Sequence, residues 1–429
     1  MDDFEWGVAT SAAQIEGIAG RGVSIWDTFV GRPGVVADSS NAEVACDHVH
    51  RWADDLALLA ELGVGAYRFS VAWPRVEPSA DAVNTAGLDF YDRLVDGLLA
   101  RSITPVVNLY HWDLPQWLQD AGGWSERATA DRYASYASVV AARLGDRVGT
   151  WATMNEPFEH FVLGHITGEH APGLNLPLDR AFAVAHHLLL AHGLGVQALR
   201  AVNAERVMLI NSYAPARPAS PAEADVNAAG LYDLLQNRLF TDPVLTGAYP
   251  DELAPLLPVQ DGDLDVIAAP IDALGVNYYS INAVRAVDGP VPLEVIAPAG
   301  YPTTAFGWAV APEGLTEALV GLRDRYGSRL PPLTVTENGC AYNDQLRDGG
   351  CDDPDRIAYL DAHIGAVRTA RAAGVDVRGY HVWSLYDNFE WAQGYTKRFG
   401  LAYLDFPTQR RIPKTSFAWY REVITRGLP

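Results

Sequence analysis

The sequence is poor in cysteine and lacks long apolar runs, and each of these shortages excludes a class of protein. Its 429 residues include only 3 cysteines, too few for a disulfide framework, although Cys340 and Cys351 could meet across a loop. No uncharged apolar stretch reaches roughly 18 residues, so we expect no transmembrane helix. The chain begins MDDFEW, with acidic residues where a secretory signal has basic ones. We therefore expect a cytoplasmic location.

Positive charge is also scarce, and lysine is nearly absent. The 32 Lys and Arg residues stand against 53 Asp and Glu, giving a net charge of −21, which opposes binding to nucleic acids or anionic membranes. Only Lys397 and Lys414 are lysines, so the other 30 of the 32 are arginines. We expect neither a nucleic acid nor a membrane as partner, and the sequence leaves the oligomeric state open. Hydrophobic residues make up 49% of the chain, enough for a sizeable core.

What the sequence does contain is a regular alternation of β-rich runs and helical patterns. Eight β-rich runs occur, at 4–12, 65–73, 104–112, 148–156, 207–214, 273–280, 333–339 and 377–385. Several are almost continuously apolar (TPVVNLY, VMLINSY), which is typical of strands covered on both faces. Helical patterns lie between them, at 49–62, 88–101, 129–144, 178–202 and 355–373.

Eight such units predict an α/β protein with one (β/α)8 barrel domain spanning 1–429. The polar stretches rich in proline and glycine, at 32–47, 215–226, 286–305 and 340–355, are expected to be loops over one mouth of the barrel. In barrel enzymes the chemistry lies at the carboxyl ends of the strands.

Amides, aromatic rings and carboxylates gather at those strand ends. In chain order they are Gln14, Arg68, His111, Trp112, Asn155, Glu156, Asn211, Tyr213, Asn277, Tyr279, Glu337, Asn338, Trp383, Glu390 and Trp391. This set contains neither a metal-ligand cluster nor a Ser/His/Asp arrangement, so we expect no metal and no cofactor. Amides and acids bind hydroxyls while Trp faces stack on sugar rings, which indicates a sugar site. Two glutamates on facing strands suit cleavage of a glycosidic bond.

The motifs around these residues resemble those of glycoside hydrolase family 1, the β-glucosidase family. The resemblance covers about residues 4–420, and the segments that carry it, in order, are FEWGVATSAAQIEG, SIWDTF, ACDHVHRW, YRFSVAWPR, HWDLPQWL, TMNEP, HAPG, GVNYYS, GWAVAPEGL, VTENG and WSLYDNFEWAQGYTKRFGL. It implies a retaining β-glucosidase on a (β/α)8 barrel, acting on a small-molecule β-glycoside.

Residue roles follow from the resemblance. It implies that Glu156 of TMNEP is the general acid/base and Glu337 of VTENG the nucleophile, with Arg68, Tyr279 and Asn277 beside them. It further implies a set of residues that bind the sugar, namely Gln14, His111, Trp112, Asn155, Trp383, Glu390, Trp391 and Phe399, and two on the aglycone side, Phe158 and Trp308.

The chemistry of a retaining enzyme makes these roles specific. Its two carboxyl groups lie only about 5–5.5 Å apart, one attacking the anomeric carbon while the other protonates the leaving oxygen. We therefore expect burial and the charge of Glu337 to raise the pKa of Glu156, and Arg68 and Tyr279 to keep Glu337 ionised. Glu390 should repel a 6-phosphate, which favours unphosphorylated sugars.

Two departures from the family pattern leave the leaving group open. Phe158 stands where many relatives have Trp, and Tyr386 replaces a common aliphatic residue. A family relative specialised for deglycosylating a secondary metabolite, and an enzyme with broad glucosidase, fucosidase and galactosidase activity, are therefore alternatives. A non-catalytic sugar-binding barrel is disfavoured because both glutamates are intact.

Overall fold

The computed structural model describes residues 4–289 and 291–428, and its centre is a closed barrel of eight parallel strands. The strands are β1 (Glu5–Ala9), β2 (Ala66–Ser70), β3 (Thr104–Asn108), β4 (Thr150–Asn155), β5 (Arg206–Ser212), β7 (Ala273–Asn277), β10 (Leu333–Asn338) and β11 (Val377–Trp383). Their order around the barrel is β1-β11-β10-β7-β5-β4-β3-β2. The expected (β/α)8 barrel is confirmed.

The strands end earlier than the sequence runs predict. β3 stops at Asn108, and the chain then leaves the sheet before Trp112, which has a φ of 71°. β4 stops at Asn155, and Glu156 has a φ of 46°. Such left-handed positions interrupt regular strand pairing. His111, Trp112 and Glu156 therefore lie on short segments just past the strands. Other polar residues of this mouth, namely Arg68, Asn155, Asn277 and Glu337, lie within the strands near their carboxyl ends.

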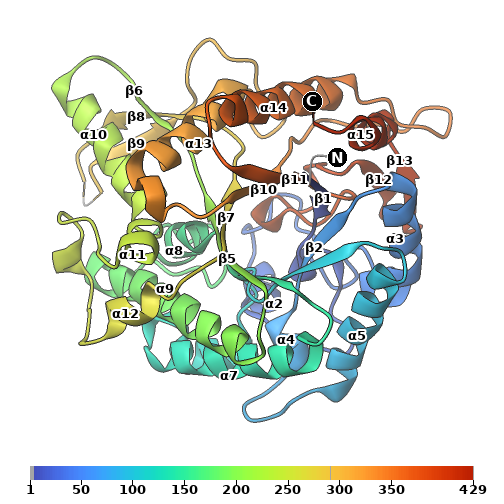
Figure 1. Ribbon diagram of the computed structural model, residues 1–429, viewed down its shortest axis with the longest axis horizontal. Coiled ribbons are helices and arrows are strands. Elements are labelled where there is room, and N and C mark those ends of the chain that lie inside the picture. Colours follow the sequence, from blue (N-terminus) through green and yellow to red (C-terminus); the bar gives the residue numbers. More distant parts are fainter. Residues whose placement is uncertain (1–3, 290, 429) are drawn as a thin grey trace.

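Long helices surround the barrel (Figure 1). They are α3 (His48–Leu62), α5 (Thr85–Leu99), α7 (Ala128–Leu144), α9 (Leu178–Ala201), α13 (Pro312–Tyr326), α14 (Pro354–Ala372) and α15 (Thr415–Arg426). Five of them were predicted from the sequence, whereas those at 312–326 and 415–426 were not. In α3 the apolar residues Leu56, Leu59 and Leu62 are buried, and Gly63 ends the helix with a φ of 79°. A glycine in this conformation satisfies the last carbonyls without steric cost.

Short helices occupy the connections, chiefly at the mouth. They are α1 (Ala12–Ile15), α2 (Ile25–Val30), α4 (Trp73–Val76), α6 (Gln116–Asp120), α8 (Pro157–His165), α10 (Glu223–Asp233), α11 (Asp242–Thr246) and α12 (Asp263–Ile267). A π-helical turn, η2 (Leu234–Arg238), follows α10.

Within the described residues one helix, α9, is long and apolar enough to span a membrane by length and composition. Most of its apolar window is buried inside the protein. A core helix has the same composition, and α9 packs against α7, α8 and α12. Its apolar character is therefore explained by its place in the core.

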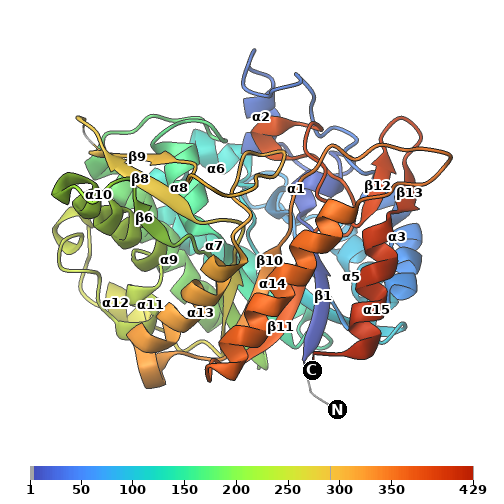
Figure 2. The ribbon, with the colours of Figure 1, turned by 90° about the horizontal axis from the view of Figure 1, so that it is seen from above.

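Two of the four expected loops contain regular structure. Residues 215–226 and 286–305 include β6 (Ala216–Pro218), β9 (Leu293–Ile296) and the start of α10. With β8 (Asn282–Ala286) these strands form a small sheet in the order β6-β8-β9, beside α10 (Figure 2). The expectation of plain loops was wrong because Val284 of this sheet buries against Ala228, Ala229 and Tyr232.

A second pair of strands, β12 (Ala402–Asp405) and β13 (Arg410–Pro413), forms an antiparallel hairpin before α15. The structure contains no disulfide between Cys340 and Cys351, since both of these cysteines and Cys46 are free and buried.

Gly339 should be irreplaceable, because a Cβ there would lie 1.9 Å from the carbonyl oxygen of Trp383. We expect Gly339→Ala to destabilise the protein by about 1–3 kcal/mol or more, as overpacking does. Gly365→Ala is the matched control, since no atom lies within 4 Å of its Cβ in α14 and helix propensity favours alanine by about 1 kcal/mol. Denaturant unfolding measures both, and equal effects would contradict the close approach.

Candidate active site

Two glutamates face each other across the mouth of the barrel. Glu156 follows β4, and Glu337 lies near the end of β10, with β5 and β7 between those strands. Only 6% of Glu156 and 3% of Glu337 is exposed. Two carboxyl groups enclosed in this way cannot both be ionised at low cost.

Glu337 is held by two donors. A guanidinium nitrogen of Arg68 (Nη2) pairs with its Oε1, and the Tyr279 hydroxyl donates to its Oε2 over 2.6 Å. Arg68 is wholly buried. These contacts support an ionised carboxylate, because both oxygens accept from charged or strongly polar donors.

Asn155 connects these groups into one network. Its Oδ1 accepts from Arg68 Nη1 over 2.9 Å and from Asn277 Nδ2 over 3.0 Å. Its Nδ2 lies 3.2 Å from Glu156 Oε2 and 3.2 Å from His111 Nε2. The amide therefore joins the two glutamates through hydrogen bonds, and its orientation is fixed from both sides.

The electrostatics separate the two carboxyl groups. Burial raises the pKa of Glu156 well above its ordinary value, and the negative charges of Glu337 and Glu159 add to the rise. Burial also lowers the pKa of His111 well below its usual range, and the charge of Arg68 adds to the fall. Both shifts favour the neutral form of the group, a protonated Glu156 and an uncharged His111.

A second group of polar residues lies beside α1. Gln14 Nε2 donates to the Phe389 carbonyl over 2.8 Å, to Asn388 Oδ1 over 3.2 Å and to Glu390 Oε2 over 3.4 Å. Gln14 Oε1 is buried and has no hydrogen-bond partner among the described residues. Burial raises the pKa of Glu390 to about 8, with a further contribution from the charge of Glu337.

Aromatic rings line the same half of the site. His111 stacks on Trp383 at 5.9 Å and on Trp391 at 6.0 Å, and Trp112 lies 4.9 Å from Trp391. The indole of Trp112 also donates to the Asn155 carbonyl over 2.9 Å. The sequence-predicted aromatic residues therefore come together with the predicted amides.

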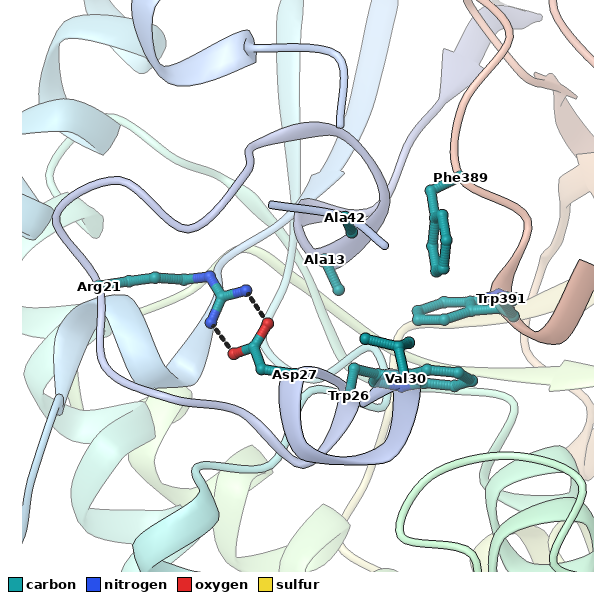
Figure 3. Close-up of a pocket in the computed structure, with 8 residues that line it drawn as sticks. All are labelled: Ala13, Arg21, Trp26, Asp27, Val30, Ala42, Phe389 and Trp391. Carbon is teal, nitrogen blue, oxygen red and sulfur yellow. Dashed lines mark hydrogen bonds and ion pairs between the residues drawn. The ribbon is translucent and has the colours of Figure 1, made fainter. Parts of the chain in front are cut away.

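Figure 3 shows the residues that pack against Trp391. Trp391 packs on Trp26 with ring centroids 4.5 Å apart, next to an ion pair between Arg21 and Asp27. The cavity between these residues and Phe389 measures about 10 Å³, room for no more than one water molecule. The rear of Trp391 is thus closely packed rather than open to a ligand.

A further aromatic group surrounds Tyr279 and packs with Trp383. Trp308 lies 5.4 Å from Tyr279 and stacks on Phe306 at 4.1 Å, and Phe399 lies 6.0 Å from Tyr279. Trp308 and Phe306 are both partly exposed, whereas only 8% of Phe158 is exposed, on α8 beside Glu156.

Some of the polar residues expected at the strand ends do not contact the two glutamates. Asn211 and Tyr213 bond to Thr241, over 3.1 Å and 2.8 Å, instead of to the glutamates. Asn338 bonds to the Tyr278 carbonyl and to Tyr380 behind the strand.

Other neighbours carried no distinct sequence signal. Glu159 accepts from Ser212 over 2.9 Å and from Gln236 over 3.3 Å, and Asn388 holds Gln14. Among the described residues no group of three or more His, Cys, Asp or Glu gathers as a metal site would require.

Comparison with known proteins agrees with this geometry. Residues 1–428 match the sequence model of glycosyl hydrolase family 1. The chain is similar to a bifunctional β-D-glucosidase/β-D-fucosidase of Bifidobacterium breve (47% identical, 98% of this chain and 97% of that one) and to β-glucosidase A of Thermotoga maritima (43%, 99% and 97%). Among solved structures it is similar to a psychrophilic β-glucosidase from Micrococcus antarcticus (TM-score 0.95, 43% identical, 99% and 97% covered). It is also similar to the Thermotoga maritima enzyme in complex with glucoimidazole (TM-score 0.94, 42%, 99% and 98%).

The raised pKa of Glu390 should make stability depend on pH. The folded protein keeps this proton up to a pH of about 8, whereas an unfolded chain releases it near 4.5, so stability falls as pH rises between them. We expect Glu390→Gln, which cannot ionise, to raise Tm relative to the unmodified protein more at pH 8 than at pH 5. Thermal unfolding at both pH values measures this. A gain that is the same at both would show that Glu390 is not held protonated.

Proposed function

Because the chain belongs to glycosyl hydrolase family 1, we propose that it is a retaining β-glucosidase that releases terminal non-reducing β-D-glucosyl residues from β-glucosides or cello-oligosaccharides. One observation carries the proposal. Glu156 and Glu337 lie in one hydrogen-bonded network but in opposite electrostatic settings, one with a raised pKa and the other held by Arg68 and Tyr279. A retaining glycosidase needs such a pair.

In the first step of the proposed reaction, Glu337 attacks the anomeric carbon while Glu156 gives its proton to the leaving oxygen. The glycosidic bond breaks and a glycosyl–enzyme ester forms. Once the ester has removed the charge of Glu337, Glu156 loses one cause of its raised pKa and can act as a base. It then takes a proton from water, which attacks the anomeric carbon and releases Glu337.

The sugar is proposed to bind on the side of α1 and β11. Gln14, with its unpartnered oxygen, and Glu390 would bind the 3-, 4- and 6-hydroxyls, and Asn155 the 2-hydroxyl. The rings proposed to enclose the sugar are those of Trp383, Trp391, Trp112, His111 and Phe399. Fucoside hydrolysis is a second candidate activity, because a relative 47% identical is named as a bifunctional glucosidase/fucosidase.

The leaving group is proposed to lie between Trp308 and Phe158, with the polar side chain of Glu159 nearby. Deglycosylation of a secondary metabolite is the alternative role, and degradation of cellulose fragments in the cytoplasm is the role we propose. Nitrophenyl glycosides that vary the sugar, followed by natural glucosides that vary the aglycone, test these choices. Failure to hydrolyse any β-glucoside would reject the function.

Glu337→Gly should abolish nearly all β-glucoside hydrolysis while the barrel stays folded, because the nucleophile is lost and the core is untouched. Azide or formate, small enough to fill the gap beside Arg68, should restore part of the turnover with a nitrophenyl glucoside. Circular dichroism checks folding. Activity close to that of the unmodified enzyme would rule out Glu337 as the nucleophile.

The loss of activity caused by Glu156→Ala should depend on the leaving group of the substrate. A nitrophenolate needs little protonation, so a glycosyl–enzyme burst should form and then turn over slowly. With cellobiose both steps suffer, and kcat/KM should fall by more than the roughly 10²–10⁴ typical of general acid catalysis. Pre-steady-state release of nitrophenol and cellobiose kinetics measure the two cases. Equal losses on both substrates would contradict the role of acid/base.

A further inference from the structure

Lys414 is one of two lysines among 32 basic residues. Unlike most charged side chains, it is buried. Its ammonium group is fully enclosed and donates to Asp344 Oδ2 over 2.5 Å and to Asp387 Oδ1 over 2.8 Å. Lysine presents a compact point charge, whereas arginine presents a wide planar fork. A space between two carboxylates at these distances suits the ammonium group.

The two carboxylates belong to different loops of the active-site mouth. Asp344 lies in the loop after β10, which carries Glu337, and Asp387 lies in the segment between β11 and Glu390. Lys414 itself precedes α15, and its backbone N–H donates to the Leu401 carbonyl over 3.0 Å. One side chain therefore ties both loops to the C-terminal part of the chain.

The rest of this ionic cluster leaves Asp387 little freedom. Arg398 donates to its Oδ2 over 2.6 Å, and the backbone N–H groups of Gly400 and Leu404 donate over 3.0 Å and 3.3 Å. Burial works against ionisation, but the charges of Lys414 and Arg398 hold the pKa of Asp387 below its ordinary value. Asp387 is wholly buried, and Glu390 lies only three residues further along.

The far end of the cluster reaches the segment that follows Glu337. Arg356 pairs with Asp344 and with Asp353, and its guanidinium also donates to the carbonyl of Cys340, three residues after Glu337. Three carboxylates thus meet three cations in the cluster of Asp344, Asp353, Asp387, Lys414, Arg356 and Arg398. Removing one cation would leave a buried charge uncompensated, so the loops would move.

We propose that Lys414 is a positioning residue for Glu390. It holds the segment from Trp383 to Glu390 in place, and the resulting position of Glu390 sets the preference of the enzyme for sugars that carry a 6-hydroxyl. The inference rests on the proposed function, because it assigns Glu390 to the sugar. Lys414 touches neither glutamate of the reaction, so its effect is on recognition of the sugar rather than on the chemical step.

The test compares nitrophenyl β-glucoside with its 6-deoxy analogue on the unmodified enzyme and on Lys414→Ala. A hydrogen bond between Glu390 and the 6-hydroxyl contributes up to roughly tenfold in kcat/KM. We expect Lys414→Ala to bring the ratio of kcat/KM for the glucoside to kcat/KM for its 6-deoxy analogue close to one. Methylammonium or ethylammonium should restore part of the ratio by filling the vacated space. Arg426→Ala, on the exposed face of α15, is the control and should keep the ratio.

A double-mutant cycle with Glu390→Ala separates positioning from general damage. If Lys414 acts through Glu390, adding Lys414→Ala to Glu390→Ala should leave the ratio where Glu390→Ala alone puts it. Asp344→Asn weakens one end of the lysine contact and one of the two carboxylate pairs of Arg356. It gives the same comparison if Lys414→Ala does not fold, and it should shift the ratio in the same direction.

Equal losses on both substrates, or an additive double mutant, would overturn the positioning role. If the unmodified enzyme hydrolyses no β-glucoside, the proposed function fails. If it does hydrolyse them and the ratio never moves, only this inference fails.

Discussion

The site depends on placing the negative charge of Glu337 inside a barrel without leaving it uncompensated. A buried, unpaired carboxylate would cost several kcal/mol or would take up a proton. Arg68 removes that cost, since its guanidinium is wholly buried and pairs with Glu337 on one side and Asn155 on the other. β2 fixes Arg68 and β10 fixes Glu337, so the closed barrel itself maintains this ion pair.

The properties of the neighbouring groups follow from that pair. Burial favours the protonated form of Glu156, and the negative charge of Glu337 adds to this effect. Burial also favours the neutral form of His111, and the positive charge of Arg68 adds to that effect. The Asn155 amide hydrogen-bonds to Arg68, His111 and Glu156, and it reaches Glu337 only through Arg68. An acid and a carboxylate can therefore coexist in one small volume at neutral pH.

Much of this could be predicted from the sequence, because periodicity reports which faces are buried. The eight strands and five of the long helices follow from it, whereas α13 and α15 were missed. The strand ends identified Glu156, Glu337, Arg68 and Asn155 as neighbours. Strand lengths were overestimated, since residues past the sheet are as apolar as those in it. The sheet beside α10 was missed, because its short strands lie among prolines and glycines.

Side-chain direction was the other quantity that the sequence did not supply. Asn211 and Tyr213 lie at a strand end like Asn155 and Asn277, yet they bond to Thr241 on the connection before α11. Asn211 lies inside β5 and Tyr213 just past its end, and the sequence alone does not show which partner each side chain faces. Glu159 was missed for a related reason, because its partner Gln236 comes from a π-helical turn far along the chain.

The half of the mouth proposed to bind the sugar and the half proposed to bind the leaving group are built under unequal constraints. The sugar half combines Gln14 and Trp383, both buried, with a segment held by buried ion pairs at Asp387, so a change there affects the stability of the whole protein. The leaving-group half uses Trp308 and Phe306, which are partly exposed on an irregular segment whose neighbouring Gly307 is open to solvent. Exposed aromatic residues contribute less to folding, so substitutions there cost little stability. Specificity for the leaving group can therefore change while recognition of the sugar stays fixed.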